Sequence, residues 1–112
     1  MKEEWYIAVN NRPRRYDCVK LIKERGYYSI YRCIDDVWED GDDSPYNMDE
    51  YLNLIPEICL LVAIGAKTDR NVKTWVKSNL IKKQSNSLDK IEAFLKEHNI
   101  PFEYGHTYVS PY

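Results

Sequence analysis

Residues 58–64, with the sequence ICLLVAI, form the longest apolar run in this chain of 112 residues. The run shows no alternation of apolar and polar residues, contains β-branched side chains, and lies between Pro56 and Gly65. Such a pattern is typical of a strand that is buried on both faces, as in a parallel sheet. The run is too short to cross a membrane as a helix. The sequence therefore predicts a buried central strand.

Strand and helix patterns alternate on both sides of this run. Aromatic and β-branched residues favour strands at 5–9 and 27–34, and a last strand is expected at 101–104. Helices are expected in four other segments: at 13–26, at 48–54, after a cap at Thr68 or Asp69, and after a cap at Ser87.

This alternation predicts an α/β fold, because parallel strands need long crossover connections that helices usually provide. We expect a small flavodoxin-like three-layer sandwich, with a mostly parallel sheet of about three to four strands covered on both faces. A ferredoxin-like α+β arrangement is the alternative. In either case residues 1–112 are expected to form a single domain, since a chain of this size supports one hydrophobic core.

Charge is distributed unevenly along the chain, although its formal sum is only −2. Residues 1–34 carry eight basic and four acidic side chains, residues 35–60 nine acidic and no basic ones, and residues 61–112 eight basic and five acidic ones. The overall balance of 16 Lys and Arg against 18 Asp and Glu excludes a generally basic nucleic-acid binder. It predicts instead a molecule with one strongly acidic region.

The three cysteines indicate a reduced, cytoplasmic protein. Cys18, Cys33 and Cys59 cannot all pair within the chain, and none belongs to a CxxC motif. Cys59 is expected to pack inside the buried strand, and the other two to be half-buried. No signal peptide is recognised and no membrane association is expected.

Polar and basic residues follow the expected strands at the edge where open α/β sheets bind their ligands. Two of these loops lead into helix N-termini, which attract anions. The sequence predicts a ligand site there, with a nucleotide as the possible ligand and no other cofactor. Its residues are Asn10, Asn11, Arg12, Arg14, Arg15, Gly65, Lys67 and Thr68. The chain has no glycine-rich phosphate-binding motif, so a merely solvated set of loops is the alternative.

A dense acidic segment predicts a second site, for a protein partner with a basic surface. Closely spaced carboxylates repel one another, which favours either full solvation or a cationic partner, and two aromatic residues offer apolar anchors. The residues of this site are Asp35, Asp36, Trp38, Glu39, Asp40, Asp42, Asp43 and Tyr46. Divalent-metal binding is an alternative for these carboxylates, but the segment does not fit an EF-hand loop, because Trp38 and Asn47 occupy ligand positions of that template.

No catalytic set is recognisable in the sequence. Neither His98 nor His106 has a positional link to a candidate nucleophile, so a structural role is expected for both. No group of residues has the spacing of metal ligands, and Trp75 is expected to fill the core. These patterns favour binding over catalysis.

Four segments form a familiar order: Glu24–Arg25–Gly26, the acidic turn after 27–34, the run 58–64 and the sequence TWVKSNL at 74–80. Together they resemble a Toll/interleukin-1 receptor (TIR) domain, and the resemblance covers about residues 5–81. It implies a flavodoxin-like scaffold with a nucleotide-sized cleft. Nucleoside 2-deoxyribosyltransferase-like proteins share that architecture and resemble the chain nearly as well.

The resemblance also bears on activity. TIR domains that are enzymes cleave the nicotinamide–ribose bond of NAD with a glutamate in a W-C-x-x-E-L-like motif. The corresponding position here is Asn79, which carries no charge and cannot stabilise an oxocarbenium-like transition state as a carboxylate does. The resemblance therefore implies the scaffold without this activity.

Together these observations favour a non-catalytic binding protein that uses its acidic segment for a protein partner. Two alternatives remain open. One is a glycosidase or transferase acting on NAD or a nucleoside, with Asp35, Asp36 or Glu39 as the working carboxylate. The other is a small inhibitor or immunity-type protein whose acidic surface covers a basic active site.

Overall fold

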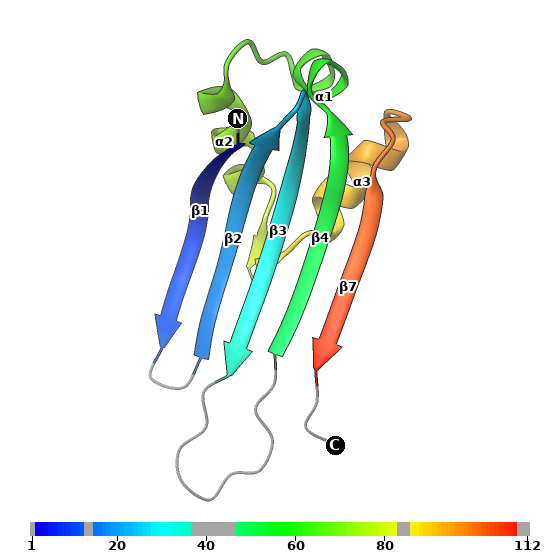
Figure 1. Cartoon of the computed structure of the whole chain (residues 1–112). Helices are drawn as coiled ribbons and strands as arrows, with labels where there is room; N and C mark the ends of the chain where they lie inside the picture. Colours follow the sequence, from blue (N-terminus) through cyan, green and yellow to red (C-terminus); the bar gives the residue numbers. More distant parts are fainter. Residues whose placement is uncertain (1, 13–14, 37–46, 83–85, 110–112) are drawn as a thin grey trace, which may run out of the picture.

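The protein is built around a five-stranded sheet in which every pair of neighbouring strands is antiparallel. The computed structural model describes residues 2–12, 15–36, 47–82 and 86–109. The strands follow the order β1-β2-β3-β4-β7 across the sheet (Figure 1). They are β1 (Lys2–Arg12), β2 (Arg15–Glu24), β3 (Tyr27–Asp36), β4 (Asn47–Pro56) and β7 (Glu103–Val109).

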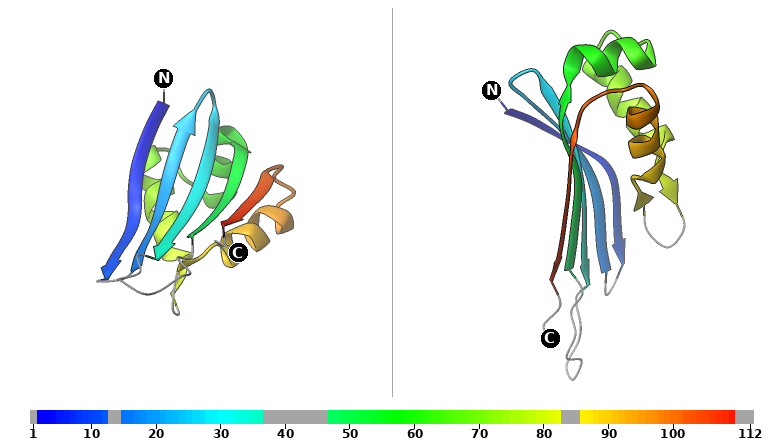
Figure 2. Two further views of the ribbon diagram at one scale, coloured as in Figure 1. Left: turned by 60° about the horizontal axis from the view of Figure 1, so that its bottom comes forward. Right: turned by 90° about the vertical axis from the view of Figure 1, so that its right-hand side faces the viewer.

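Helices cover only one side of this sheet (Figure 2). The helices are α1 (Glu57–Ile64), α2 (Asp69–Ser78) and α3 (Asp89–Glu97), and a two-stranded ribbon of β5 (Ile81–Lys82) and β6 (Asn86–Ser87) separates α2 from α3. We call the side that carries the helices the covered face and the other side the open face. None of the described helices is long and apolar enough to cross a membrane.

The expected flavodoxin-like sandwich with a mostly parallel sheet is therefore wrong. The first four strands follow one another as an antiparallel meander, whose neighbours need no crossover helix. The ferredoxin-like alternative does not describe the chain either, because that fold places a helix between its first two strands. With helices on one side only, the fold is a two-layer α+β arrangement rather than a three-layer one.

The apolar run at 58–64 is a helix and not a central strand. Within α1 only Leu60 is buried, whereas Ile58 and Val62 are each 76% exposed and Cys59 is exposed rather than packed in the core. Gly65 ends the helix in the left-handed conformation (φ 68°), a position that favours glycine. A short apolar run does not by itself distinguish a buried strand from a helix.

The segment expected to form the first helix is strand β2. Its side chains alternate between the faces: Val19 and Leu21 are fully buried on the covered face, and Lys20 and Ile22 lie on the open face. Gly26 does not end a helix but joins β2 to β3 in a turn in which it and Arg25 both have positive φ (82° and 53°). Two positive values are the pattern of a type I′ hairpin turn.

The segment 48–54, expected to be helical, is part of strand β4. Tyr28 pairs with Ile55 and Ile30 with Leu52, so two residues of β4, Asn53 and Leu54, lie opposite the single residue between them in β3. This β-bulge leaves Leu52 and Ile55 both fully buried although they are three residues apart. That spacing resembles one side of a helix, which explains the wrong prediction.

Several local predictions are confirmed. The expected strands at 5–9 and 27–34 lie within β1 and β3. The Thr68 hydroxyl accepts a hydrogen bond from the Asn71 N–H (3.4 Å) at the start of α2. The Ser87 hydroxyl accepts one from the Asp89 N–H (3.2 Å), although the N-cap position of α3 is the next residue, Leu88, which makes no side-chain cap hydrogen bond. Both helices therefore begin within one residue of the positions that their sequence caps indicate.

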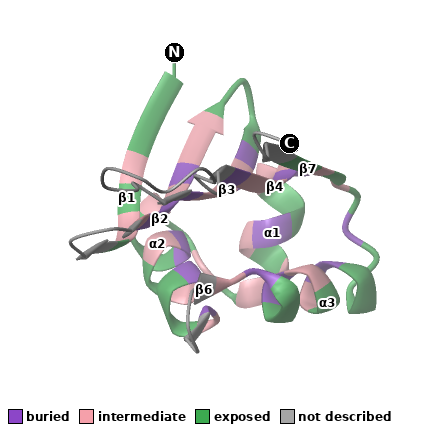
Figure 3. Ribbon diagram, turned by 90° about the horizontal axis from the view of Figure 1, so that it is seen from below, coloured by how far each residue is buried: buried purple, intermediate pink, exposed green. Residues whose placement is uncertain are grey.

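The core lies between the covered face and the helices, where buried residues of both layers meet (Figure 3). Its largest fully buried side chains from the sheet are Leu21, Tyr28, Ile30, Leu52 and Ile55, and from the helices Leu60, Val72, Ile91 and Leu95. A polar link fastens α2 to the sheet: Asp69 accepts hydrogen bonds from the Tyr28 hydroxyl (2.5 Å) and the Lys23 ammonium (3.1 Å). This link holds the helix layer in register with the strands.

Candidate functional site

The residues expected to form one ligand cleft lie at two ends of the sheet. Asn10, Asn11 and Arg12 belong to the end of β1, and Arg12 pairs with Arg15 at the start of β2. Gly65, Lys67 and Thr68 lie between α1 and α2, beyond the end of β4 that pairs with the start of β3 (Figure 1). Arg14 is outside the described residues. The structure thus does not bring the two groups together.

The described residues that flank the acidic segment lie at one end of the inner strands β3 and β4. Asp35 and Asp36 are the last residues of β3, and Asp35 pairs with Asn47 at the start of β4. The other members of the expected partner site lie outside the described residues: Trp38, Glu39, Asp40, Asp42, Asp43 and Tyr46. One more carboxylate, Asp49, lies nearby on the open face, opposite Cys33.

The position that carries the catalytic glutamate in TIR enzymes has a structural role here. Asn79 ends α2 on the covered side, and its side-chain amide donates a hydrogen bond to the Trp75 carbonyl (2.7 Å). His98 likewise ends α3, with its Nδ1 3.0 Å from the Phe94 carbonyl, and His106 is exposed in β7. Among the described residues, no group of three or more His, Cys, Asp or Glu could hold a metal ion.

The open face is rich in tyrosine, a feature that sequence reasoning missed. Tyr31 and Tyr51 pair across β3 and β4, and their rings are parallel (3° between planes) with centroids 6.0 Å apart. Gly105 of β7 lies beside Tyr51, where a Cβ atom would collide with the ring. The glycine thus gives the Tyr51 ring its space. The Lys20 ammonium lies 5.4 Å from the Tyr31 ring centroid.

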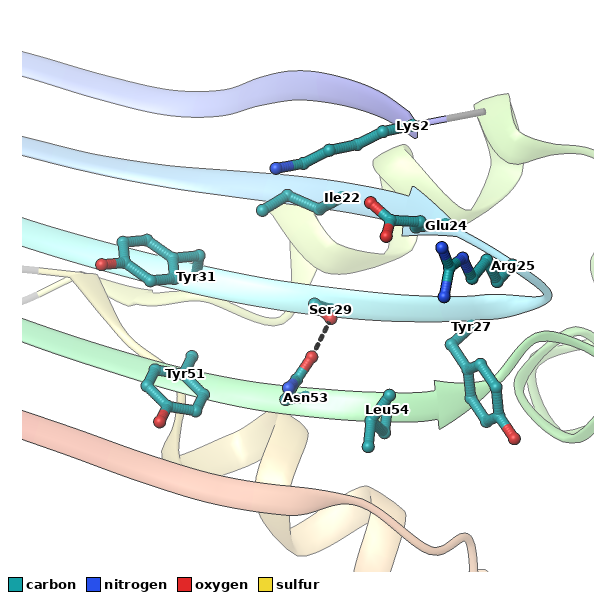
Figure 4. A pocket seen from close by; sticks show the side chains of 10 residues that line it. All are labelled: Lys2, Ile22, Glu24, Arg25, Tyr27, Ser29, Tyr31, Tyr51, Asn53 and Leu54. Atoms are coloured by element: carbon teal, nitrogen blue, oxygen red, sulfur yellow. Dashed lines mark hydrogen bonds between the residues drawn. The ribbon is translucent and has the colours of Figure 1, made fainter.

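A pocket of about 580 Å³ opens on this face at the bulge of β4 (Figure 4). The bulge places Asn53 and Leu54 in the lining of the pocket. The Ser29 hydroxyl donates a hydrogen bond to the side-chain amide oxygen (Oδ1) of Asn53. The residues that line it are Lys2, Ile22, Glu24, Arg25, Tyr27, Ser29, Tyr31, Tyr51, Asn53 and Leu54. Bulges frequently redirect side chains at binding sites.

The ionisable groups on the open face keep defined states at neutral pH. Burial and a hydrogen bond to Asp49 raise the pKa of Tyr31 to about 12, so its hydroxyl stays protonated. Burial also raises the pKa of the Cys18 thiol, which therefore stays protonated as well. The Lys2 ammonium contacts the Glu4 carboxylate at 3.4 Å. The face thus offers neutral hydroxyl groups and aromatic rings, with the charged residues Lys20 and Asp49 beside Tyr31.

The alternation in β3 was the signal that could have revealed this face. Tyr27, Ser29 and Tyr31 are two residues apart and share one side of a strand, as period-two spacing requires. The open face was not predicted because the segment that forms β2, the neighbour of β3 in the sheet, was expected to be a helix. The bulge in β4 could not be recognised from local spacing.

No protein-family model, curated protein or solved structure matches this chain. The interpretation of the open face therefore depends on its geometry and chemistry.

Proposed function

We propose that this protein is a non-catalytic binding protein that holds a protein partner with a basic surface on its open face. The observation that carries the proposal is that Asp36 and Asn47, the described residues that flank the acidic segment, lie at the end of the sheet near Asp49. Asp49, Tyr31 and Tyr51 share a face that no described helix covers (Figure 2).

Charge defines the partner's chemistry. Residues 35–60 carry nine acidic and no basic side chains, and Asp35 pairs with Asn47 across β3 and β4. Mutual repulsion among these carboxylates is relieved when a cationic surface approaches. Complementary charge also accelerates the diffusional encounter of two proteins. A basic active-site cleft is one such surface, so inhibition of an enzyme is a specific form of the proposed function.

The tyrosines supply the apolar part of the contact. Tyrosine is enriched at protein interfaces because it offers a large contact area and loses little conformational entropy. The stacked arrangement of Tyr31 and Tyr51 already holds both rings in place. The protonated hydroxyl of Tyr31 can also donate to a partner when Asp49 is engaged elsewhere.

The separation of Asp35 and Asp36 from the pocket favours binding over catalysis. A glycosidase or transferase needs a carboxylate beside its bound substrate. Asp35 and Asp36 lie at the far end of β3 from Tyr27, which lines the pocket, and Glu39 is outside the described residues. Among the described residues that line the pocket, the one carboxylate is that of Glu24, which is followed by the cation Arg25.

The proposal is tested by titrating the ¹⁵N-labelled protein with a synthetic peptide of alternating arginine and serine. We expect the largest amide shift changes at Asp35, Asp36 and Asp49, because these residues lie at the end of the sheet that flanks the acidic segment. Binding should weaken with salt, since the Debye length falls from about 10 Å at 0.1 M to about 3 Å at 1 M. Shifts confined to the helix layer would contradict the proposal.

A pair of charge-matched double variants gives the control. Asp35→Asn with Asp36→Asn should weaken peptide binding by at least about threefold, as the loss of two exposed ion pairs predicts. Asp89→Asn with Glu97→Gln removes the same charge from exposed positions of α3 and should change binding little. Equal losses in both proteins would show that only total charge matters.

The enzymatic alternative is tested separately. The protein is incubated with NAD and with nucleosides, and released base is measured by chromatography. We expect no release above the rate in buffer. Release that increases in proportion to protein concentration would overturn the non-catalytic part of the proposal.

A further inference from the structure

The pocket at the bulge shares Tyr31 and Tyr51 with the proposed partner surface and extends from them toward the end of the open face away from Asp35 and Asp36. Its volume of about 580 Å³ falls within the range of about 300–1,000 Å³ typical of small-ligand sites. Its wall is formed by apolar side chains and aromatic rings: Ile22, Tyr27, Tyr31, Tyr51 and Leu54. Such a wall suits a flat ring, which can stack on or pack against the tyrosines.

The floor of the pocket presents a donor and an acceptor side by side. The Ser29 hydroxyl donates to the side-chain oxygen Oδ1 of Asn53. The side-chain nitrogen Nδ2 of Asn53 therefore points away from Ser29 (Figure 4). Its N–H groups can donate to a ligand, and the Ser29 oxygen can still accept. A nucleobase presents adjacent acceptors and donors along one edge, which matches this arrangement.

The charged residues at the margin favour an anionic group. Among the described residues that line the pocket, three side chains are charged at neutral pH, Lys2, Glu24 and Arg25, and their sum is one positive charge. Lys2 is engaged by Glu4 at 3.4 Å, whereas Arg25 makes no ion pair within the described part of the chain. A guanidinium group binds phosphate oxygens in a bidentate manner.

We propose that this pocket binds a mononucleotide, with the base against the tyrosine wall and the phosphate at Arg25. A single nucleotide is favoured over a nucleic acid because Asp49 lies farther along the same face, toward the end of the sheet where β3 ends at Asp35 and Asp36. A polyanion extending along the face would meet this charge, whereas nucleic-acid binding requires several phosphate contacts with cations.

The backbone at the pocket is consistent with a binding role. Leu54 has a positive φ of 54°, a left-handed conformation that disfavours branched side chains. Strained residues of this kind cluster at ligand sites. Here the strain keeps the Leu54 side chain, which is 42% exposed, at the rim of the pocket.

The test is isothermal titration calorimetry of the full chain with AMP, GMP, CMP and UMP, and with adenosine and inorganic phosphate as partial ligands. We expect one mononucleotide or more to bind about tenfold more tightly than adenosine or phosphate alone, as one charge-assisted hydrogen-bonding group predicts. In ¹⁵N spectra the shifted amides should include Ser29, Tyr51 and Asn53. These readouts are independent of Asp35 and Asp36, so the partner proposal and this one can fail separately.

Variants assign the two halves of the ligand. Arg25→Asn should weaken mononucleotide binding by about tenfold and leave adenosine binding unchanged; asparagine tolerates the left-handed turn position, so the hairpin is retained. Arg70→Asn, at an exposed position of α2, is the matched control and should bind normally. Tyr51→Ala should weaken both mononucleotide and adenosine.

Three results would overturn the proposal. One is the absence of binding by all four mononucleotides at millimolar concentration. Another is an Arg25→Asn variant that folds, as its spectrum would show, and binds like the wild type. The last is a single-stranded oligonucleotide that binds more tightly than any mononucleotide, which would replace a nucleotide site with a nucleic-acid surface.

Discussion

The two faces of the sheet are built from the same strands but carry different kinds of side chain. On the covered face Leu21, Ile30 and Leu52 are fully buried against the helices. On the open face Tyr31 and Tyr51 remain partly exposed, with polar residues between them. Alternation along each strand lets one set of residues stabilise the fold and the other set remain available for binding.

The bulge in β4 determines which side chains lie on both faces of the sheet. By placing two residues opposite one, it returns Ile55 to the core after Leu52 and also brings Asn53 and Leu54 to the pocket. A regular strand would direct Ile55 to the open face and lose its burial. Stability and the candidate site are therefore coupled at this point of the chain.

The largest difference between the faces should appear when apolar residues are shortened. Leu52→Ala should lower the free energy of unfolding by about 2–5 kcal/mol, because it leaves a cavity in the core. Ile22→Ala, on the open face of β2, should lower the free energy of unfolding by about 1 kcal/mol. Urea unfolding of both variants measures the difference. Equal costs would mean that the open face is covered in solution.

Removing the link between Asp69 and the sheet residues Tyr28 and Lys23 should have the next largest effect on the free energy of unfolding. Burial alone raises the pKa of Asp69, but hydrogen bonds from Tyr28 and Lys23 outweigh it and hold the pKa below its ordinary value. Asp69→Asn should lower the free energy of unfolding by about 1–3 kcal/mol at pH 7.

The pH dependence of that effect follows from the lowered pKa. A carboxylate with a depressed folded pKa contributes stability above its unfolded pKa of about 4 and loses it as the pH falls through the folded value. The wild type's advantage over Asp69→Asn should therefore be constant at neutral pH and shrink below about pH 4. An advantage that persists in acid would contradict the charged link.

Relieving the strain at the bulge should separate stability from binding. Leu54→Gly should raise the free energy of unfolding by about 1 kcal/mol, since glycine adopts φ 54° without a steric cost. It should also weaken mononucleotide binding, because the pocket loses part of its wall. Asn99→Gly, at φ 55° after α3, is the control and should gain less, since asparagine tolerates this conformation. A stability loss in Leu54→Gly would argue against strain.

The smallest effect on stability is expected for the cysteines, which differ in how fast their thiols react rather than in how much they stabilise the fold. Cys59 is exposed on α1 and should react with a thiol reagent in the native protein. Cys18 is buried, and burial raises the pKa of its thiol, so it should react only on unfolding. Mass spectrometry after brief labelling distinguishes them. Cys59→Ser should change the free energy of unfolding by less than about 0.5 kcal/mol.

Part of the fold could be predicted from local chemistry. The caps at Thr68 and Ser87 act within two or three residues of themselves, so their effect is visible in the sequence. The strands around 5–9 and 27–34 also follow from β-branched and aromatic residues. The ligand site was predicted from basic and polar residues that follow the expected parallel strands, and the structure separates these residues because β2 is a strand and not a helix.

By itself the sequence determined where α2 and α3 begin, which residues of β3 alternate, and that residues 35–60 are acidic. Only the tertiary structure decided that 58–64 is a helix and that 48–54 is a strand. The physical reason is that caps and turns depend on neighbouring residues, whereas an apolar run or a bulge takes its conformation from the partner that buries it. The open face was decided in the same way, by which side the helices came to cover.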